Sequence, residues 1–320
     1  MHVDVFNGDA DGICALLQLR LATAKKATLI TGIKRDIQLL QQVTELEDVS
    51  SVTVLDISME KNLTALHSLL DSDVPVFYCD HHRHGEIPSN GRLTALIDVE
   101  PNTCTSLLVN THLHGAFAKW AVVGAFGDNM FARAYDLANE LKLPQSDTEF
   151  LKELGTLLNY NGYGASIEDL HFPPSELYQL LLNYDCPLKL RDDPASAFYV
   201  LRKGFGEDTK NTQELTPIVT SEAATVFELP CEAWARRISG VFGNDLANQS
   251  PGTAHAVMTL NQSGEDYTVS VRAPINNRVG ADEVCSAFAT GGGRKAAAGI
   301  NQLPIAKKNE FIEALTRFYQ

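Results

Sequence analysis

Hydrophobic and polar positions follow two recurring patterns along the first part of the chain, namely short apolar runs and longer segments of helical period. The short runs are rich in Val, Ile and Leu and predict strands at residues 2–6, 27–31, 51–55, 74–79 and 93–97. Helical patterns lie between them, for example over residues 62–70. Apolar strands that alternate with helices are typical of a parallel sheet covered on both faces. We therefore predict an α/β domain here.

The pattern changes after the fifth predicted strand. Residues 103–185 have a helical period, and residues 187–212 are polar and rich in turn-forming residues. This predicts a domain over 1–186, a linker over 187–212 and a smaller α/β domain over 213–320. In the second domain we expect strands at 223–229, 254–260 and 267–271, the last two as a hairpin, and helices at 234–247, 281–288 and 311–318.

Acids and histidines follow several of the predicted strands. Asp9 and Asp11 come after the first strand, Asp56 ends the third, and the fourth runs into Asp80-His81-His82. Because the carboxyl ends of parallel strands meet at one edge of the sheet, these side chains are expected to gather there. Asp128 follows an apolar helical segment and on its own would be interpreted as a helix cap.

Composition narrows the classes of partner. The chain has 320 residues, 44% of them hydrophobic, and a formal net charge of −14, which argues against a protein that grips long nucleic acid by its phosphates. Its 6 cysteines are scattered without a CxxC pair, as expected of reduced thiols in the cytoplasm. No apolar run approaches the length of a membrane span, so we expect no membrane partner.

The acids and one imidazole make a mixed oxygen and nitrogen donor set, namely Asp9, Asp11, Asp56, Asp128 and His81. Clustered carboxylates repel one another unless cations compensate them. Such donors suit Mn²⁺, with Mg²⁺ as the alternative, and a pair of ions about 3.5–4 Å apart serves in-line displacement at phosphorus. In an extended segment Asp9 and Asp11 would point the same way, so each could serve one ion while Asp56 bridges both.

Here the chain resembles a known family. Asp9-Ala-Asp11-Gly12, Asp56, Asp80-His81-His82 and Asp128 occur in the order and at about the spacings of the DHH phosphoesterases. Gly291-Gly292-Gly293 with Ala297-Ala298-Gly299 is similar to the signature of the companion DHHA1 domain. The family includes RecJ-like exonucleases, phosphatases of nanoRNA and of phosphoadenosine-phosphate, and phosphodiesterases of cyclic or linear dinucleotides. The resemblance covers essentially the whole chain and implies this fold and a metal-dependent activity.

The resemblance also implies residue roles. Two manganese ions would be held, the first by Asp9 and Asp56, and the second by Asp11, Asp56, His81 and Asp128. Asp80 would orient an imidazole, and His82 would face the substrate phosphate as a donor or proton source. Asn7 stands where the family usually has His or Asp, so it would be a weak ligand of the first ion.

Candidate substrate-binding residues come from both domains: Arg272, Gly291, Gly292, Gly293, Arg294, Lys34, Arg35 and Thr105. Arg272 matches a basic position of the companion domain and is expected to meet a terminal phosphate. Arg294 replaces the family's usual His and suits phosphate or the edge of guanine. The alternatives are a tight turn for the glycines, a solvated loop for Lys34 and Arg35, and helix capping for Thr105.

These observations favour a metal-dependent phosphodiesterase that hydrolyses short linear nucleotides, such as pGpG or other nanoRNA, to mononucleotides. A phosphatase of small bisphosphates such as pAp, or of pyrophosphate or polyphosphate, would need the same metals. A nucleotide-binding regulator with a decayed site is the alternative outside the enzymes, and Asn7 alone supports it. We expect a cytoplasmic protein, for which a homodimer is compatible with the sequence.

Overall fold

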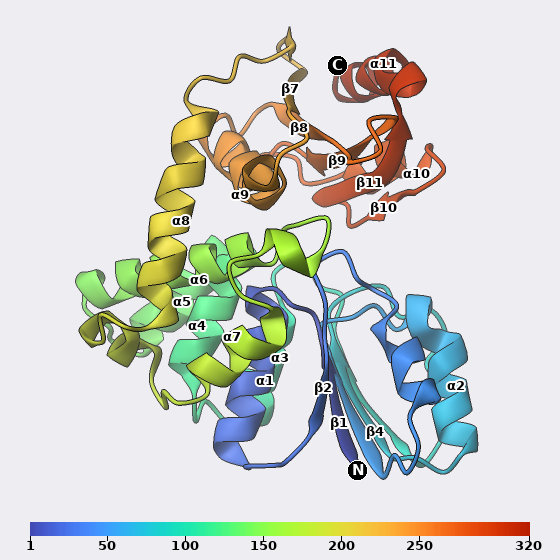
Figure 1. Cartoon of the computed structure of the whole chain (residues 1–320), viewed down its shortest axis with the longest axis vertical. Coiled ribbons are helices and arrows are strands. Elements are labelled where there is room, and N and C mark those ends of the chain that lie inside the picture. Colours follow the sequence, from blue (N-terminus) through green and yellow to red (C-terminus); the bar gives the residue numbers. More distant parts are fainter. The chain divides into compact units, whose positions relative to one another are not determined.

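The computed structural model describes all 320 residues. They form two compact units, Met1–Lys203 and Gly204–Gln320, each described here by itself (Figure 1). The segment predicted as a linker contains a 3-10 helix, Pro187–Asp192, and helix α8, Ala197–Thr212, within which the boundary between the units falls. The domain limits given above stay a prediction.

The first unit is built on the predicted parallel sheet. Its strands are β1 (His2–Phe6), β2 (Thr28–Ile30), β3 (Ser51–Leu55), β4 (Val76–Asp80) and β5 (Leu93–Ile97), in the order β2-β1-β3-β4-β5. All pairs are parallel, which confirms the expected fold class. Phe6 pairs with Leu55 and Leu55 with Cys79, so three strands end at the same level. The residues that follow them therefore share one edge of the sheet.

Helices cover both faces of this sheet. They are α1 (Ala10–Ala22), α2 (Leu63–Asp71), α3 (Thr105–His112), α4 (Ala118–Gly127), α5 (Phe131–Glu140), α6 (Gln145–Asn161) and α7 (Pro174–Leu181), with 3-10 helices at Leu39–Glu45, Glu60–Asn62 and Ile167–Asp169. Helix α2 lies on one face, and α1, α3 and α4 lie on the other (Figure 1). Every residue of α4 except Lys119 is buried, as its apolar sequence requires.

Helices α4 and α6 approach closely because glycines face each other. A Cβ on Gly155 would lie 2.3 Å from the Val123 carbonyl oxygen, and one on Gly127 would lie 2.9 Å from the Gly155 carbonyl oxygen. No larger residue fits without moving a helix. This contact fixes the carboxyl end of α4, from which Asp128 projects.

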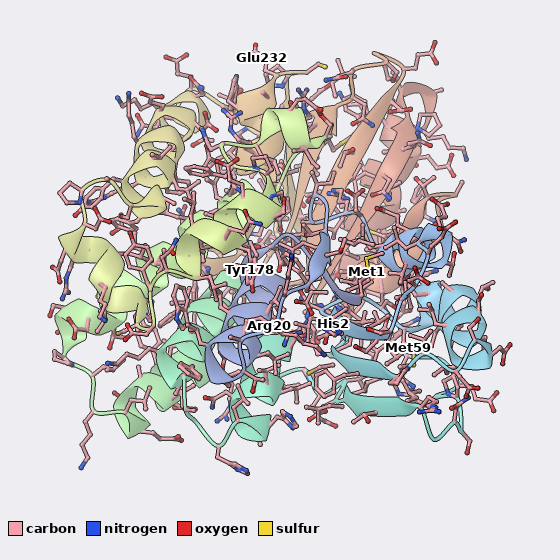
Figure 2. The ribbon with its side chains drawn as sticks, turned by 60° about the horizontal axis from the view of Figure 1, so that its bottom comes forward. Met1, His2, Arg20, Met59, Tyr178 and Glu232 are labelled. Carbon is pink, nitrogen blue, oxygen red and sulfur yellow. The ribbon has the colours of Figure 1, made fainter.

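A buried charge cluster joins α1 to β1 near the amino end of the sheet (Figure 2). The Arg20 Nε donates to Asp4 Oδ2 at 2.9 Å, and the His2 Nε2 lies 2.9 Å from Asp4 Oδ1. Burial raises the pKa of Asp4, but hydrogen bonds from Arg20 and His2 outweigh it and hold the pKa below its usual value. The cluster stabilises the end of the sheet opposite the candidate site.

The second unit holds a mixed sheet of order β10-β11-β9-β8-β7-β6. Its elements are β6 (Val219–Thr220), β7 (Ala224–Leu229), α9 (Ala233–Gln249), β8 (Ala254–Leu260), β9 (Asp266–Arg272), α10 (Ala281–Ser286), β10 (Gly291–Gly293), β11 (Ala297–Pro304), a 3-10 helix Ile305–Lys307, and α11 (Lys308–Tyr319). Strands β8 and β9 pair antiparallel, as the expected hairpin does. No helix in either unit is long and apolar enough to cross a membrane.

Candidate metal centre

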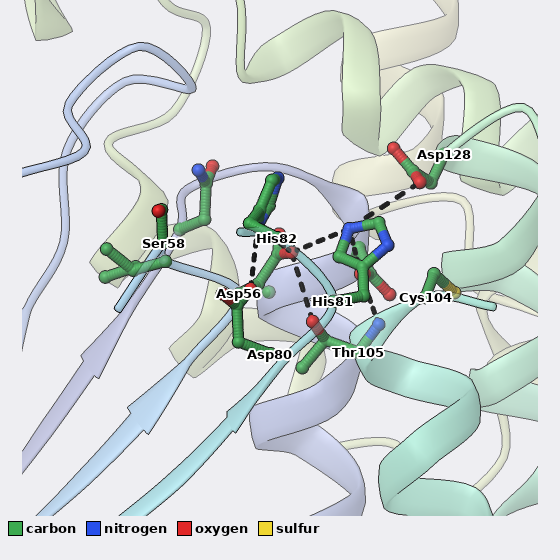
Figure 3. A network of polar contacts seen from close by, with 12 residues as sticks. Asp56, Ser58, Asp80, His81, His82, Cys104, Thr105 and Asp128 are labelled. Atoms are coloured by element: carbon green, nitrogen blue, oxygen red, sulfur yellow. Dashed lines mark hydrogen bonds and ion pairs between the residues drawn. The ribbon is translucent and has the colours of Figure 1, made fainter. Parts of the chain in front are cut away.

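The candidate site lies at the carboxyl edge of the parallel sheet (Figure 3). Four parts of the fold deliver its acids and imidazoles, namely the start of α1 (Asp9 and Asp11), the end of β3 (Asp56), the end of β4 (Asp80, His81 and His82) and the end of α4 (Asp128). All except His82 and Asp128 are buried, and these two are partly buried. The shared strand ends thus bring together residues far apart in sequence.

Asp9 and Asp11 do not point the same way, which corrects the expectation of an extended segment. Helix α1 already begins at Ala10, so Asp9 is its N-cap and Asp11 lies in its first turn. The Asp9 Oδ1 accepts hydrogen bonds from the backbone N–H groups of Asp11 at 3.0 Å and Gly12 at 3.1 Å. Because the helix turns between them, the two carboxylates meet different partners.

Asp11 caps a second helix. Its two carboxylate oxygens accept the backbone N–H groups of Thr105 and Ser106, each at 2.8 Å, at the start of α3. The sequence suggested that Thr105 or its neighbours cap this helix, but the residue at the N-cap position, Cys104, makes no capping side-chain bond. A carboxylate at a helix N-terminus is favourable because it also meets the positive end of the helix dipole. Asp11 is therefore held rigidly.

Asp56 is the most constrained acid of the cluster. Its backbone has a positive φ of 59°, which Asp tolerates better than most residues, and its N–H donates to the Cys79 carbonyl at 3.1 Å. The Thr105 hydroxyl, which is buried, donates to Asp56 Oδ1 at 3.1 Å. Burial, followed by the nearby carboxylates of Asp11 and Asp9, raises the pKa of Asp56 well above its usual value. The carboxylate needs a positive partner to stay ionised.

His81 turns its Nε2 toward three carboxylates. Its Nδ1 lies 3.0 Å from the Thr103 carbonyl, which can only accept, so Nδ1 carries a proton and Nε2 is the nitrogen left to face the site. Around Nε2 stand Asp56 Oδ1 at 3.4 Å, Asp11 Oδ2 at 3.8 Å and Asp128 Oδ2 at 3.9 Å. Donors of an ion with bonds of about 2.1 Å stand about 3–4 Å apart. Asp56, His81 and His82 offer ligand atoms that all lie within 4.8 Å of one another, and the Asp11 and Asp128 oxygens lie within 4 Å of His81 Nε2, so the cluster has the donors to hold a divalent cation.

Asp80 and His82 form a pair beside this cluster. Asp80 Oδ1 lies 2.7 Å from His82 Nδ1, and the Asp80 carboxylate is fully buried. Burial raises the pKa of Asp80, but the His82 imidazole outweighs it and lowers the pKa below its usual value. The His82 side chain is 29% exposed and its Nδ1 lies 3.8 Å from Asp56 Oδ1. Asp80 thus fixes the ring of a histidine that remains accessible.

Asp9 forms an ion pair with a lysine of the same chain, Lys34. The Lys34 ammonium donates to Asp9 Oδ2 and, at 2.9 Å, to Asn159 Oδ1. Asn7 lies beside them, where its Oδ1 accepts the Asp9 N–H and its Nδ2 donates to the Lys34 carbonyl, both at 3.2 Å. The sequence carried no signal for Asn159, which lies in α6 among ordinary helical residues. Arg35, next in the chain, is half-buried.

Comparisons with known proteins identify the fold. No family model and no curated protein matches the chain. Among solved structures, manganese-bound exonuclease RecJ is similar over 99% of this chain and 90% of its own, with 18% identity and a TM-score of 0.63. RecJ of Thermus thermophilus with Mn²⁺ has 20% identity and a TM-score of 0.63 over 99% of this chain, which spans 52% of that protein. The pGpG-specific phosphodiesterase PggH of Vibrio cholerae has 11% identity and a TM-score of 0.53, over 100% of this chain and 99% of its own.

The chain has the fold of these proteins, with a DHH unit, Met1–Lys203, and a DHHA1 unit, Gly204–Gln320. In its DHH unit the structure brings together the acids and imidazoles that sequence reasoning singled out. Two of the candidate substrate-binding residues lie beside these acids, Lys34 at Asp9 and Thr105 at Asp56. Of the remaining candidate residues, Arg35 belongs to the same unit as Lys34, and the others belong to the DHHA1 unit: Arg272, Gly291, Gly292, Gly293 and Arg294.

In the DHHA1 unit, Arg272 and the glycines lie on strands of one sheet that are separated by β11. Arg272 ends β9, and its Nε donates to Asn244 Oδ1 of α9 at 2.6 Å, a partner that sequence reasoning missed. The glycines form edge strand β10, paired with β11. Gly293 has a φ of 141°, and a Cβ there would lie 2.5 Å from the Ala298 Cα, so only glycine fits. Arg294 follows in the turn to β11 and is half-buried.

Proposed function

We propose that the chain is a divalent-metal-dependent phosphodiesterase that hydrolyses short linear nucleotides, such as pGpG or other nanoRNA, to mononucleotides. One observation carries the proposal: buried His81 turns its Nε2 toward three carboxylates, a set of donors that suits a divalent cation. The likeness to manganese-bound RecJ and to PggH supports it at the level of the fold. Mn²⁺ is the ion we propose to test first.

The chain's own residues supply positioning and proton transfer in this proposal. A divalent cation held by Asp11, Asp56, His81 and Asp128 would polarise a phosphoryl oxygen and lower the pKa of a bound water. The Thr105 hydroxyl and the α3 backbone fix Asp56 and Asp11 before substrate arrives. We assign to His82 the donation of a proton to the leaving oxygen, because Asp80 holds its Nδ1 and its ring is partly exposed.

The proposed substrate is short because the chain is acidic. A net charge of −14 opposes the long phosphate backbone of a nucleic acid, whereas a dinucleotide needs only a few local basic groups. We propose Arg272 for a terminal phosphate, the N–H groups of Gly291, Gly292 and Gly293 for a further anion, and Arg294 for phosphate or base. All 6 cysteines are free, which is in keeping with the cytoplasm as the proposed compartment.

A hydrolysis panel tests the proposal. Purified protein with Mn²⁺ receives pGpG, pApA, a cyclic dinucleotide, a pentanucleotide RNA, pAp and pyrophosphate, and products are resolved by anion exchange. Release of mononucleotides from a linear dinucleotide supports the proposal, and activity confined to pAp or pyrophosphate would replace it with a phosphatase. No hydrolysis of any substrate would favour the nucleotide-binding regulator.

The matched variants are Asp56→Ala and His81→Ala, with Lys26→Ala, an exposed lysine, as control. We expect both site variants to fold, as judged by circular dichroism, and to lose hydrolysis because the cation loses a buried ligand. Turnover at about a tenth of wild type or more in either one would contradict the assignment of the metal centre.

A further inference from the structure

Asp9 is a buried acid that already has its cation. The Lys34 ammonium lies against Asp9 Oδ2, donates to Asn159 Oδ1 at 2.9 Å, and stands 5.5 Å from the centre of the Tyr163 ring. The Asp9 side chain is 5% exposed and that of Lys34 is 23% exposed. Burial raises the pKa of Asp9, but the charge of Lys34 outweighs it and lowers the pKa. The carboxylate is thus compensated without any metal.

The backbone holds Lys34 in place. Its N–H donates to the Gly162 carbonyl at 2.8 Å, just beyond α6, and its own carbonyl accepts from Asn7 Nδ2 at 3.2 Å. A Cβ on Gly162 would lie 3.2 Å from the Asp9 Cα, so the end of α6 packs directly on this acid. The backbone of Lys34 is therefore bonded through both its N–H and its carbonyl, and its ammonium is held by Asp9 and Asn159.

Asn7 is oriented against metal binding. Its Oδ1 accepts the Asp9 N–H at 3.2 Å, and its Nδ2, which carries two protons, points to the Lys34 carbonyl. An amide supplies no charge, and this one already uses both ends within the protein. Asp9 differs from Asp11 in that one of its oxygens meets the Lys34 ammonium, and with the bonded Asn7 amide beside it these groups do not fit a second divalent cation. A dication there would also stand next to a fixed positive charge.

We propose that the Lys34 ammonium replaces one of the two metal ions expected from the sequence, so that this chain binds a single divalent cation at Asp11, Asp56, His81 and Asp128. The inference rests on the proposed function only in using the same metal centre. Lys34 then supplies a permanent positive charge beside that ion, where it can meet a phosphoryl oxygen. The sequence placed Lys34 on a loop near the substrate, and the structure gives it a defined electrostatic partner instead.

Metal stoichiometry tests this directly. Native mass spectrometry and equilibrium dialysis of the full chain with Mn²⁺ should find one ion per chain, and the electron paramagnetic resonance spectrum should be that of an isolated Mn²⁺. The double variant Asn7→His with Lys34→Met should bind a second ion and show the exchange-coupled signals of a manganese pair. Lys26→Ala is the matched lysine control and should bind one ion. Asp56→Ala should bind none.

Each result has one meaning. A coupled pair in the wild type would overturn the inference and leave the metal-dependent function standing. No bound ion in the wild type would overturn both. If the double variant folds, as judged by circular dichroism, and still binds one ion, Lys34 does not exclude the second ion and the inference is wrong. If it does not fold, the wild-type count and spectrum decide alone.

Discussion

Replacing Asp11 with alanine should destabilise the DHH unit even without metal. The change removes the acceptor of two buried N–H groups, those of Thr105 and Ser106, both bonded at 2.8 Å. A buried donor left without a partner costs about 1–3 kcal/mol, so the loss is about 2–6 kcal/mol. Relief of repulsion with Asp56 offsets part of it, and about 3 kcal/mol remains. For a unit of this size that corresponds to a fall in Tm of about 6–12 °C.

The assay can isolate this unit. The chain has 2 tryptophans, fully buried Trp120 in α4 and Trp234 in α9 of the other unit. In a Trp234→Phe background, thermal melting followed by fluorescence therefore reports on the DHH unit. EDTA in every sample separates the capping role of Asp11 from its role as a ligand.

Asp71→Ala provides the control, because Asp71 is an exposed acid at the end of α2. We expect its Tm to stay close to that of the parent. A fall of less than about 2 °C for Asp11→Ala, or an equal fall for Asp71→Ala, would refute the assignment of Asp11 as the cap of α3.

Three further predictions concern the same fold. Mn²⁺ at about 100 times its Kd should stabilise the DHH unit by about 2.7 kcal/mol and so raise its Tm. His81→Ala should abolish this rise in Tm. A rise retained in the variant would contradict the assignment of His81 as a ligand. Because the pKa of Asp4 is lowered in the folded state, the ionised carboxylate contributes stability that is present above the usual pKa of 3.8 and is lost as pH falls through the folded pKa. The free energy of unfolding, measured with urea, should therefore fall more steeply between about pH 4 and 2 in wild type than in Asp4→Asn. Equal slopes of this free energy against pH would argue against the prediction. Gly155→Ala should lower the free energy of unfolding by about 2 kcal/mol or more, measured by thermal unfolding, because its Cβ would lie 2.3 Å from the Val123 carbonyl oxygen. Gly206→Ala, in open space within α8, should be neutral or stabilising. Similar changes in the free energy of unfolding for the two variants would show that the close packing is unimportant.

The sheet of the DHH unit was predictable because each strand is a continuous apolar run between polar residues. The observed strands fall within one or two residues of the expected ones, for instance Thr28–Ile30 against 27–31. The rule that parallel strands end at one edge then predicted that Asp56 and His81 meet, and their closest atoms are 3.4 Å apart.

The contacts that sequence reasoning missed join residues far apart along the chain. Asp11 and Thr105 are 94 residues apart and Lys34 and Asn159 are 125 apart, and no local pattern encodes either pair. Asp9 and Asp11 were expected to be parts of one extended segment, whereas α1 begins at Ala10 between them. An N-cap followed by an acid in the first turn would have predicted their divergence.

The separation of Lys34 from Asn159 has a consequence for synthesis on the ribosome. At about 5–20 residues per second, Asn159 emerges about 6–25 s after Lys34. Throughout that interval the nascent chain carries Asp9 and Asp11, and for most of it Asp56 as well, without the helix that completes their surroundings. A cation met in the cell during this time finds scattered carboxylates and no fixed imidazole geometry. For the proposed metal centre, loading would thus be a late event that follows completion of the DHH unit.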